Sequence, residues 1–124
     1  MEKKKIATIE DIQLIVDTFY GKIRKDTLLG PIFNHIIQDR WPEHLEKMYR
    51  FWQTVLLDEH TYKGSPFVPH AHLPLRAEHF ERWKTLFFET LDDSFEGEKA
   101  EEAKFRARKM AEMFQLKIAF IQQA

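Results

Sequence analysis

The chain has 124 residues, 44% of them hydrophobic and 14% aromatic, which is enough for one compact domain with a single core. The 19 Lys and Arg residues against 20 Asp and Glu leave a formal net charge of −1, which excludes the domain-wide positive field that attracts nucleic acid or an anionic membrane. The absence of cysteine excludes a disulfide framework, a thiolate metal site and a cysteine nucleophile, and it fits a reducing compartment.

The N-terminal part of the chain is predicted to be one amphipathic helix. Thr8 can cap it, with Asp11 three residues on as an imperfect capping box. Apolar residues then recur at helical spacing: Ile12, Val16, Phe19, Tyr20 and Ile23. Because Glu10 and Asp11 interrupt the apolar stretch, the basic start cannot be a signal peptide or a membrane span. We therefore expect residues 1–7 to be a flexible tail on a cytoplasmic protein.

The next two elements are also predicted to be helical. Residues 30–40 are too apolar for a solvated loop, so a short helical turn is expected there, with Phe33 closing one edge of a pocket. Pro42 favours the start of a helix, and a second main helix is predicted over residues 42–58. Its apolar positions recur every three or four residues: His44, Leu45, Met48, Phe51, Trp52, Val55 and Leu56.

The helical spacing of apolar residues ends over residues 58–73, where Gly and Pro interrupt the chain. A stretch of about 15 residues is long for a structureless connection and is typical of a functional loop. A third helix is predicted over residues 76–94 and a fourth over 98–122, separated at Gly97. The residues expected to face inward from the last helix are Phe105, Ala107, Met110, Met113, Phe114, Ile118 and Ile121. With no strand-like alternation, the chain is predicted to be a single all-α domain with four main helices.

His70 is the strongest candidate for a functional residue. It lies in the long loop just before a helix that carries a run of aromatic and apolar residues: His79, Phe80, Trp83, Leu86 and Phe87. A ligating imidazole that faces aromatic groups and the phenol of Tyr20 indicates haem. Taken singly, each of the six histidines (35, 44, 60, 70, 72 and 79) is more often an exposed or hydrogen-bonded side chain than a ligand. Tyr20 and Trp83 could equally be ordinary core residues.

Two other classes of function stay open on the residues alone. One is a non-haem, all-α protein-interaction domain with a hydrophobic groove. The other is a metal hydrolase that uses His60, His70, His72 or His79, although neither H-E-x-x-H nor Glu-x-x-His spacing is present. Phosphate-binding Gly-rich loops and a G-x-S-x-G nucleophile elbow are absent from the sequence.

Four ordered segments resemble the group III truncated haemoglobins. They are F-Y-x-K-I/V-R-K-D at residues 19–26, L-G-P-I-F-N at 29–34, W-x-x-H with F-W at 41–52, and H-x-x-L-P followed by H-F-x-R-W at 70–83. The resemblance extends over residues 8–122. It implies a shortened globin fold, a two-over-two helical sandwich around haem b.

The resemblance also implies roles for individual residues. His70, three residues before Leu73 in the H-x-x-L-P segment, corresponds to the proximal iron ligand, and His72 is the competing choice. Tyr20 and Trp83 correspond to the distal hydrogen-bond donors, and His44 to the histidine at the distal gate. The expected haem-pocket residues are Phe33, His44, Lys47, Met48, Phe51, Arg76, Trp83 and Leu86, with Lys47 and Arg76 beside the propionates.

These roles predict a protein that binds dioxygen and other small ligands reversibly, namely nitric oxide, carbon monoxide and peroxide. Two distal donors predict slow release, which suits oxygen or nitric oxide chemistry better than bulk oxygen transport. Peroxidase-like or nitric oxide dioxygenase activity stays open, because the sequence places no basic partner beside His70. The expected partners are a diatomic ligand and an electron-donating reductase, with neither nucleic acid nor membrane, in a monomer or weak dimer.

Overall fold

The computed structural model describes residues 3–62, 64–65, 67, 70–71 and 73–123, and this part of the chain is mostly helical. The elements are α1 (Ile9–Lys25), α2 (Gly30–Ile37), α3 (Trp41–Leu57), α4 (Ala77–Ser94) and α5 (Glu98–Gln123). The all-α prediction is confirmed, and the expected helical turn after residue 30 is a complete short helix. Among the described helices, none has the length and apolar character required to cross a membrane.

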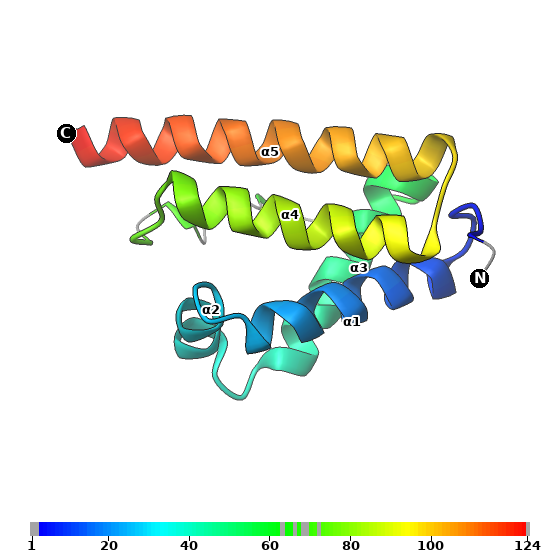
Figure 1. The fold of residues 1–124 in the computed structure, drawn as a ribbon, viewed down its shortest axis with the longest axis horizontal. Coiled ribbons are helices and arrows are strands. Elements are labelled where there is room, and N and C mark those ends of the chain that lie inside the picture. Colours follow the sequence, from blue (N-terminus) through cyan, green and yellow to red (C-terminus); the bar gives the residue numbers. More distant parts are fainter. Residues whose placement is uncertain (1–2, 63, 66, 68–69, 72, 124) are drawn as a thin grey trace.

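The helices form two packed pairs. Figure 1 shows α4 and α5 running antiparallel along one side of the molecule, with α1 below α4 and α3 crossing behind. α1 packs against both α3 and α4, and α2 packs against α1, so the first helix lies at the centre of the fold. Its fully buried side chains include Ile12, Val16, Phe19 and Ile23, which are the positions predicted from their spacing.

Local sequence explains where the helices begin and end. The Thr8 hydroxyl accepts a hydrogen bond from the Asp11 N–H, and the Asp11 carboxylate accepts from the N–H groups of Ala7 and Thr8 at 2.9 and 3.1 Å, which completes the capping box. α3 starts at Trp41 with Pro42 in its first turn. It ends at Leu57 and is capped by Asp58, whose φ of 55° lies in the left-handed region.

The sequence predicts a flexible tail over residues 1–7, and the structure shows residues 4–6 in contact with the rest of the fold. The Lys4 N–H donates to the Ser94 carbonyl at 3.1 Å, and the Glu96 N–H donates to the Lys4 carbonyl at 3.0 Å. The Lys4 ammonium also pairs with the buried Asp11 carboxylate at 2.7 Å, and Ile6 is buried in the core. Long-range pairing that the sequence pattern does not reveal holds this segment against the end of α4.

The orientation predicted for α5 needs a partial correction. Ala107, Phe114 and Ile118 are buried as expected, but Phe105 and Met113 are exposed. A row of alanines decides the inner face, because small residues let the helix approach its neighbours closely: Ala100, Ala103, Ala107 and Ala111. Large apolar residues occur around most of the helix, so their spacing alone did not distinguish the two faces.

One buried carboxylate joins three helices. Asp26 directly follows α1, and it accepts hydrogen bonds from the N–H groups of Leu28 and Leu29 at 3.1 and 2.9 Å, at the entrance to α2. From α4, the guanidinium of Arg82 donates to Asp26 Oδ1 through both Nε and Nη2 at 2.7 Å. The ion pair therefore fixes the relative positions of α1, α2 and α4.

Candidate functional site

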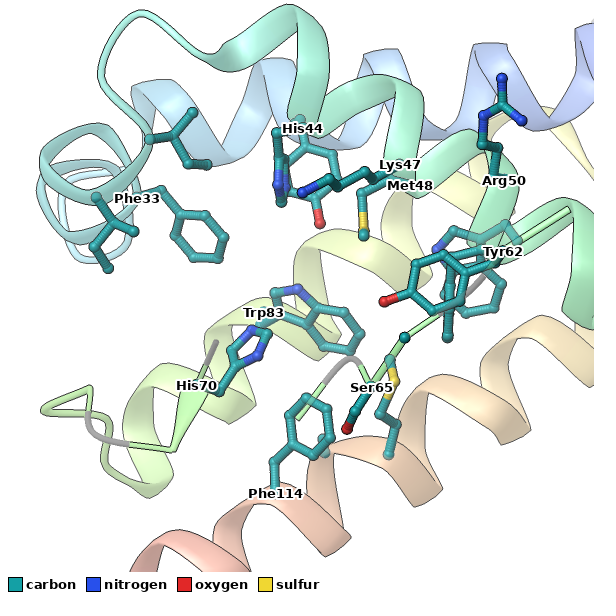
Figure 2. Close-up of a pocket in the computed structure, with 18 of the residues that line it drawn as sticks. Phe33, His44, Lys47, Met48, Arg50, Tyr62, Ser65, His70, Trp83 and Phe114 are labelled. Atoms are coloured by element: carbon teal, nitrogen blue, oxygen red, sulfur yellow. The ribbon is translucent and has the colours of Figure 1, made fainter. Parts of the chain in front are cut away.

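All five helices and the segment between α3 and α4 surround a cavity of about 600 Å³. This volume is within the usual range for a site that holds a small molecule or cofactor. Figure 2 shows His44 and Met48 on one side of the space and His70 and Phe114 on the other. Most of the lining is apolar or aromatic: Leu29, Phe33, Ile36, Ile37, Met48, Phe51, Trp52, Leu75, Phe80, Trp83, Met110, Ala111 and Phe114.

His70 lies at the cavity in the segment between α3 and α4. Its backbone N–H donates to the Phe67 carbonyl at 2.7 Å, and its ring lies 4.9 Å from that of Phe114, centroid to centroid. In Figure 2 the imidazole lies beside Trp83 and Phe114 at the edge of the open space. The arrangement presents an imidazole to whatever fills the cavity. Its sequence competitor, His72, is outside the described residues.

Tyr20 lines the cavity from α1 and is almost completely buried. Its ring lies within 5.0 Å of that of His44 and 5.9 Å of that of Trp41, both edge to face. Burial raises the pKa of the Tyr20 phenol above its ordinary value. The hydroxyl is therefore neutral at physiological pH and able to donate a hydrogen bond.

His44 lines the cavity from α3, one turn before Met48. Its Nε2 atom is buried and has no hydrogen-bond partner among the described residues. Burial, together with the nearby His70 and Lys47, lowers the pKa of His44 to about 4. The imidazole is therefore uncharged, and a buried polar atom without a partner is costly unless something in the cavity bonds to it.

Trp83 lines the cavity from α4, held by aromatic neighbours. Its ring stacks on Phe87 with centroids 5.6 Å apart and meets Phe19 edge to face at the same distance. It lies one turn after His79, which also lines the cavity. Packing on two sides leaves the indole little freedom to turn.

The structure brings together six of the eight residues predicted to contact a cofactor: Phe33, His44, Lys47, Met48, Phe51 and Trp83. Arg76 and Leu86 are not among the lining residues. Arg76 is exposed just before α4, and Leu86 is buried in the core. The cavity lies beside the first half of α4. Leu86 is about one turn beyond Trp83, so its side chain packs against the other helices and does not reach the cavity.

Sequence reasoning placed His79 on the aromatic helix but gave it no cavity role outside the metal-hydrolase hypothesis. Its Nδ1 atom accepts a hydrogen bond from the Arg76 N–H at 2.8 Å. A neutral imidazole that accepts at Nδ1 carries its proton on Nε2, so this nitrogen is a donor and not a metal ligand. The signal available in the sequence was its position one turn before Trp83.

No group of three or more His, Cys, Asp or Glu side chains that could hold a metal ion occurs within the described part of the chain. Of the histidines that the metal-hydrolase hypothesis named, His60 is exposed and is not among the cavity-lining residues, whereas His70 and His79 both line the cavity. The site therefore offers an apolar cavity with single imidazoles at its wall.

Comparisons with known proteins agree on one family. The model of the bacterial-like globin family matches residues 4–119. The chain is 40% identical over 110 residues to the group 3 truncated hemoglobin ctb of Campylobacter jejuni, which covers 86% of this chain and 87% of that protein. It is also similar to the crystal structure of the group III truncated hemoglobin from Campylobacter jejuni, with a TM-score of 0.86 and 37% identity over 94% of this chain and 95% of the other.

Proposed function

Because this chain belongs to the bacterial-like globin family, and within it to the group III truncated haemoglobins, we propose that it holds haem b in the cavity with His70 as the iron ligand. The predicted shortened globin fold is confirmed by the structural similarity. A haem cofactor follows from the family. The assignment of His70, and of the residues around it, is the proposal.

The cavity fits such a group in three respects. Its volume of about 600 Å³ and its apolar lining suit a large, flat and mostly hydrophobic cofactor. His70 presents an imidazole at the wall, the donor type that globins use for iron. The buried Nε2 atom of His44, which has no partner among the described residues, gives the opposite side a polar atom that needs a partner inside the cavity. This combination of one imidazole at each side of an apolar space is the observation that carries the proposal.

When bound, haem would supply an iron centre that can bind a diatomic ligand, and His70 would hold that iron. Phe114 and the Phe67 carbonyl hold the His70 segment in place. On the other side, the Tyr20 hydroxyl and the Trp83 indole N–H are the donors available to a ligand that carries partial negative charge. Phe33, Met48 and Phe51 exclude water around them.

The two carboxylates of haem b need cationic partners, and Lys47 is the predicted partner that lines the cavity. We do not propose Arg76 and Leu86 as haem contacts, because neither residue lines the cavity. We do propose His79 as a haem contact, with its Nε2–H as a hydrogen-bond donor.

We propose that the ligands are dioxygen, nitric oxide, carbon monoxide or peroxide. Two donors at the cavity favour slow release, which suits chemistry on the bound ligand better than bulk oxygen transport. We also propose an electron-donating reductase as a partner, since haem iron would have to be ferrous to bind dioxygen.

Absorption spectra of the purified chain test the proposal. We expect a Soret band, with changes on reduction and on addition of carbon monoxide. His70→Ala should lose the five-coordinate spectrum and regain it in part with added imidazole, whereas His35→Ala, an exposed histidine of α2, should match the unmodified protein. A normal spectrum in His70→Ala would overturn the ligand assignment. A chain that takes up no haem would favour the interaction-domain alternative.

A further inference from the structure

Three aromatic rings, from Tyr20, Trp41 and His44, meet at one wall of the cavity. They lie pairwise edge to face, with ring centroids 5.0 Å apart for Tyr20 and His44, 5.6 Å for Trp41 and His44, and 5.9 Å for Tyr20 and Trp41. Tyr20 and His44 line the cavity, whereas Trp41 is buried against both of them and is not among the lining residues. Because edge-to-face contacts favour particular geometries, the position of Trp41 affects how the other two rings lie.

Two exposed residues hold Trp41 from the surface of the molecule. The Trp41 indole N–H donates to the Asn34 Oδ1 atom at 3.2 Å, and the Asn34 Nδ2 atom donates to the Arg24 carbonyl at 3.2 Å. The Arg24 guanidinium lies over the indole ring, 4.7 Å from its centroid. Since one partner of Asn34 is a donor and the other an acceptor, only one orientation of its amide satisfies both. These contacts join the end of α1, the middle of α2 and the start of α3.

A close approach of α2 to the end of α1 places Asn34 where it can make both hydrogen bonds. A Cβ atom at Gly30 would lie 2.8 Å from the Arg24 carbonyl oxygen, so any larger residue there would push the two helices apart. Asn34 lies one turn further along the same face of α2 and reaches the same carbonyl. The glycine therefore brings Asn34 between the last turn of α1 and the indole of Trp41.

We propose that Asn34 is a positioning residue that acts through Trp41 to hold the His44 imidazole at the cavity wall, and that it thereby controls ligand entry. The inference rests on the proposed function, in which His44 and His70 lie on opposite sides of haem. The Nε2 atom of His44 has no hydrogen-bond partner among the described residues, so the orientation of the imidazole depends on its contacts with Tyr20 and Trp41. Figure 2 shows this imidazole beside the open space. Without the hydrogen bond from Trp41 to Asn34 the indole can turn, and His44 gains a second position.

Infrared spectra of the haem-loaded chain with carbon monoxide test the proposal, because the C–O stretching band shifts with the polar groups beside the gas. Asn34→Ala and Trp41→Phe each remove the hydrogen bond between these two residues. The loss of one hydrogen bond changes an equilibrium about fivefold, so a second band should grow about fivefold relative to the main band in both variants. Carbon monoxide should also associate faster by a similar factor after flash photolysis, because an imidazole that moves freely obstructs the cavity less.

Tyr49→Phe is the matched control. Tyr49 donates a hydrogen bond from α3 to Asp17 of α1 and does not line the cavity, so this variant loses a bond between helices without changing the three rings. It should keep the unmodified bands and association rate, and the Soret band should show equal haem uptake in all variants. Unmodified bands and rate in Asn34→Ala would overturn the proposal, even if Trp41→Phe, which also changes the size of the ring, behaved differently. A chain that takes up no haem would overturn the proposed function, and this inference with it.

Discussion

The imidazole of His44 meets the phenol ring of Tyr20 edge to face, with their centroids 5.0 Å apart. The two residues come from α3 and α1, which pack against each other, and both line the cavity. Burial keeps the phenol protonated and the imidazole neutral, so these two groups are polar but uncharged. Such groups can form hydrogen bonds to a small ligand.

Removing the proposed distal donors should speed the release of dioxygen. We expect Tyr20→Phe and Trp83→Phe each to raise the release rate about tenfold or more, because a hydrogen bond to a charged group contributes roughly 1.5 to 3 kcal/mol. Carbon monoxide, which carries less charge, should respond less. Stopped-flow kinetics measure both, with Tyr49→Phe as the control, since Tyr49 bonds to Asp17 outside the cavity. Unchanged release in both variants would eliminate the proposed hydrogen-bond network.

His44 should remain uncharged at every pH well above 4. Its pKa in the folded chain is lowered to about 4 from 6.5, mainly by burial. As the pH falls from 6.5 towards 4, the unfolded chain takes up this proton before the folded chain does, so this group makes the folded state less stable over that window. His44→Gln should lose that part of the pH dependence in chemical denaturation experiments. An NMR titration of His44 with a midpoint near 6.5 would contradict the expectation.

The Asp26–Arg82 pair should govern acid stability. Burial raises the pKa of Asp26, but hydrogen bonds from Arg82, Leu29 and Leu28 outweigh it and hold the pKa below its ordinary value of 3.8. The resulting stability is present above the unfolded pKa and is lost as the pH falls through the lower, folded pKa. Arg82→Gln should unfold at a higher pH than the unmodified chain in acid titrations followed by circular dichroism.

The matched control for Arg82→Gln is Arg106→Gln, since Arg106 pairs with Glu102 at the surface of α5 at 4.0 Å. This control should change acid unfolding little. If both substitutions raised the pH of acid unfolding equally, the buried Asp26 carboxylate would not be the cause of the change in Arg82→Gln.

Filling the cavity should block uptake of haem without touching His70. Ala111 is buried and lines the cavity from α5, so Ala111→Trp would place an indole inside the space, at an overpacking cost of about 1 to 3 kcal/mol. We expect the helices to form and haem binding to fall at least tenfold in a titration followed at the Soret band. Ala119→Trp, at an exposed position of the same helix, should bind normally. Normal binding by both variants would place haem elsewhere.

The fold was largely predictable because the apolar residues of α1 and α3 recur at helical spacing and because Thr8, Pro42 and Gly97 mark helix boundaries. The ordered motifs also identified the family, which the comparisons confirm. α5 was harder to orient, since large apolar side chains occur on both of its faces and a row of alanines decides which one is buried. The docking of residues 4–6 on the end of α4 was missed because backbone pairing leaves no pattern in the side chains.

The sequence alone determined the helices, their order and the residue types available for a site, since these depend on local spacing and chain connectivity. Only the tertiary structure decided which of those residues share one space. It brought Tyr20, His44 and His70 to a common cavity and left Arg76 and Leu86 out of its lining. The reason is physical: the rotation and depth of each packed helix depend on its partners, so the direction of a side chain follows from packing among distant segments.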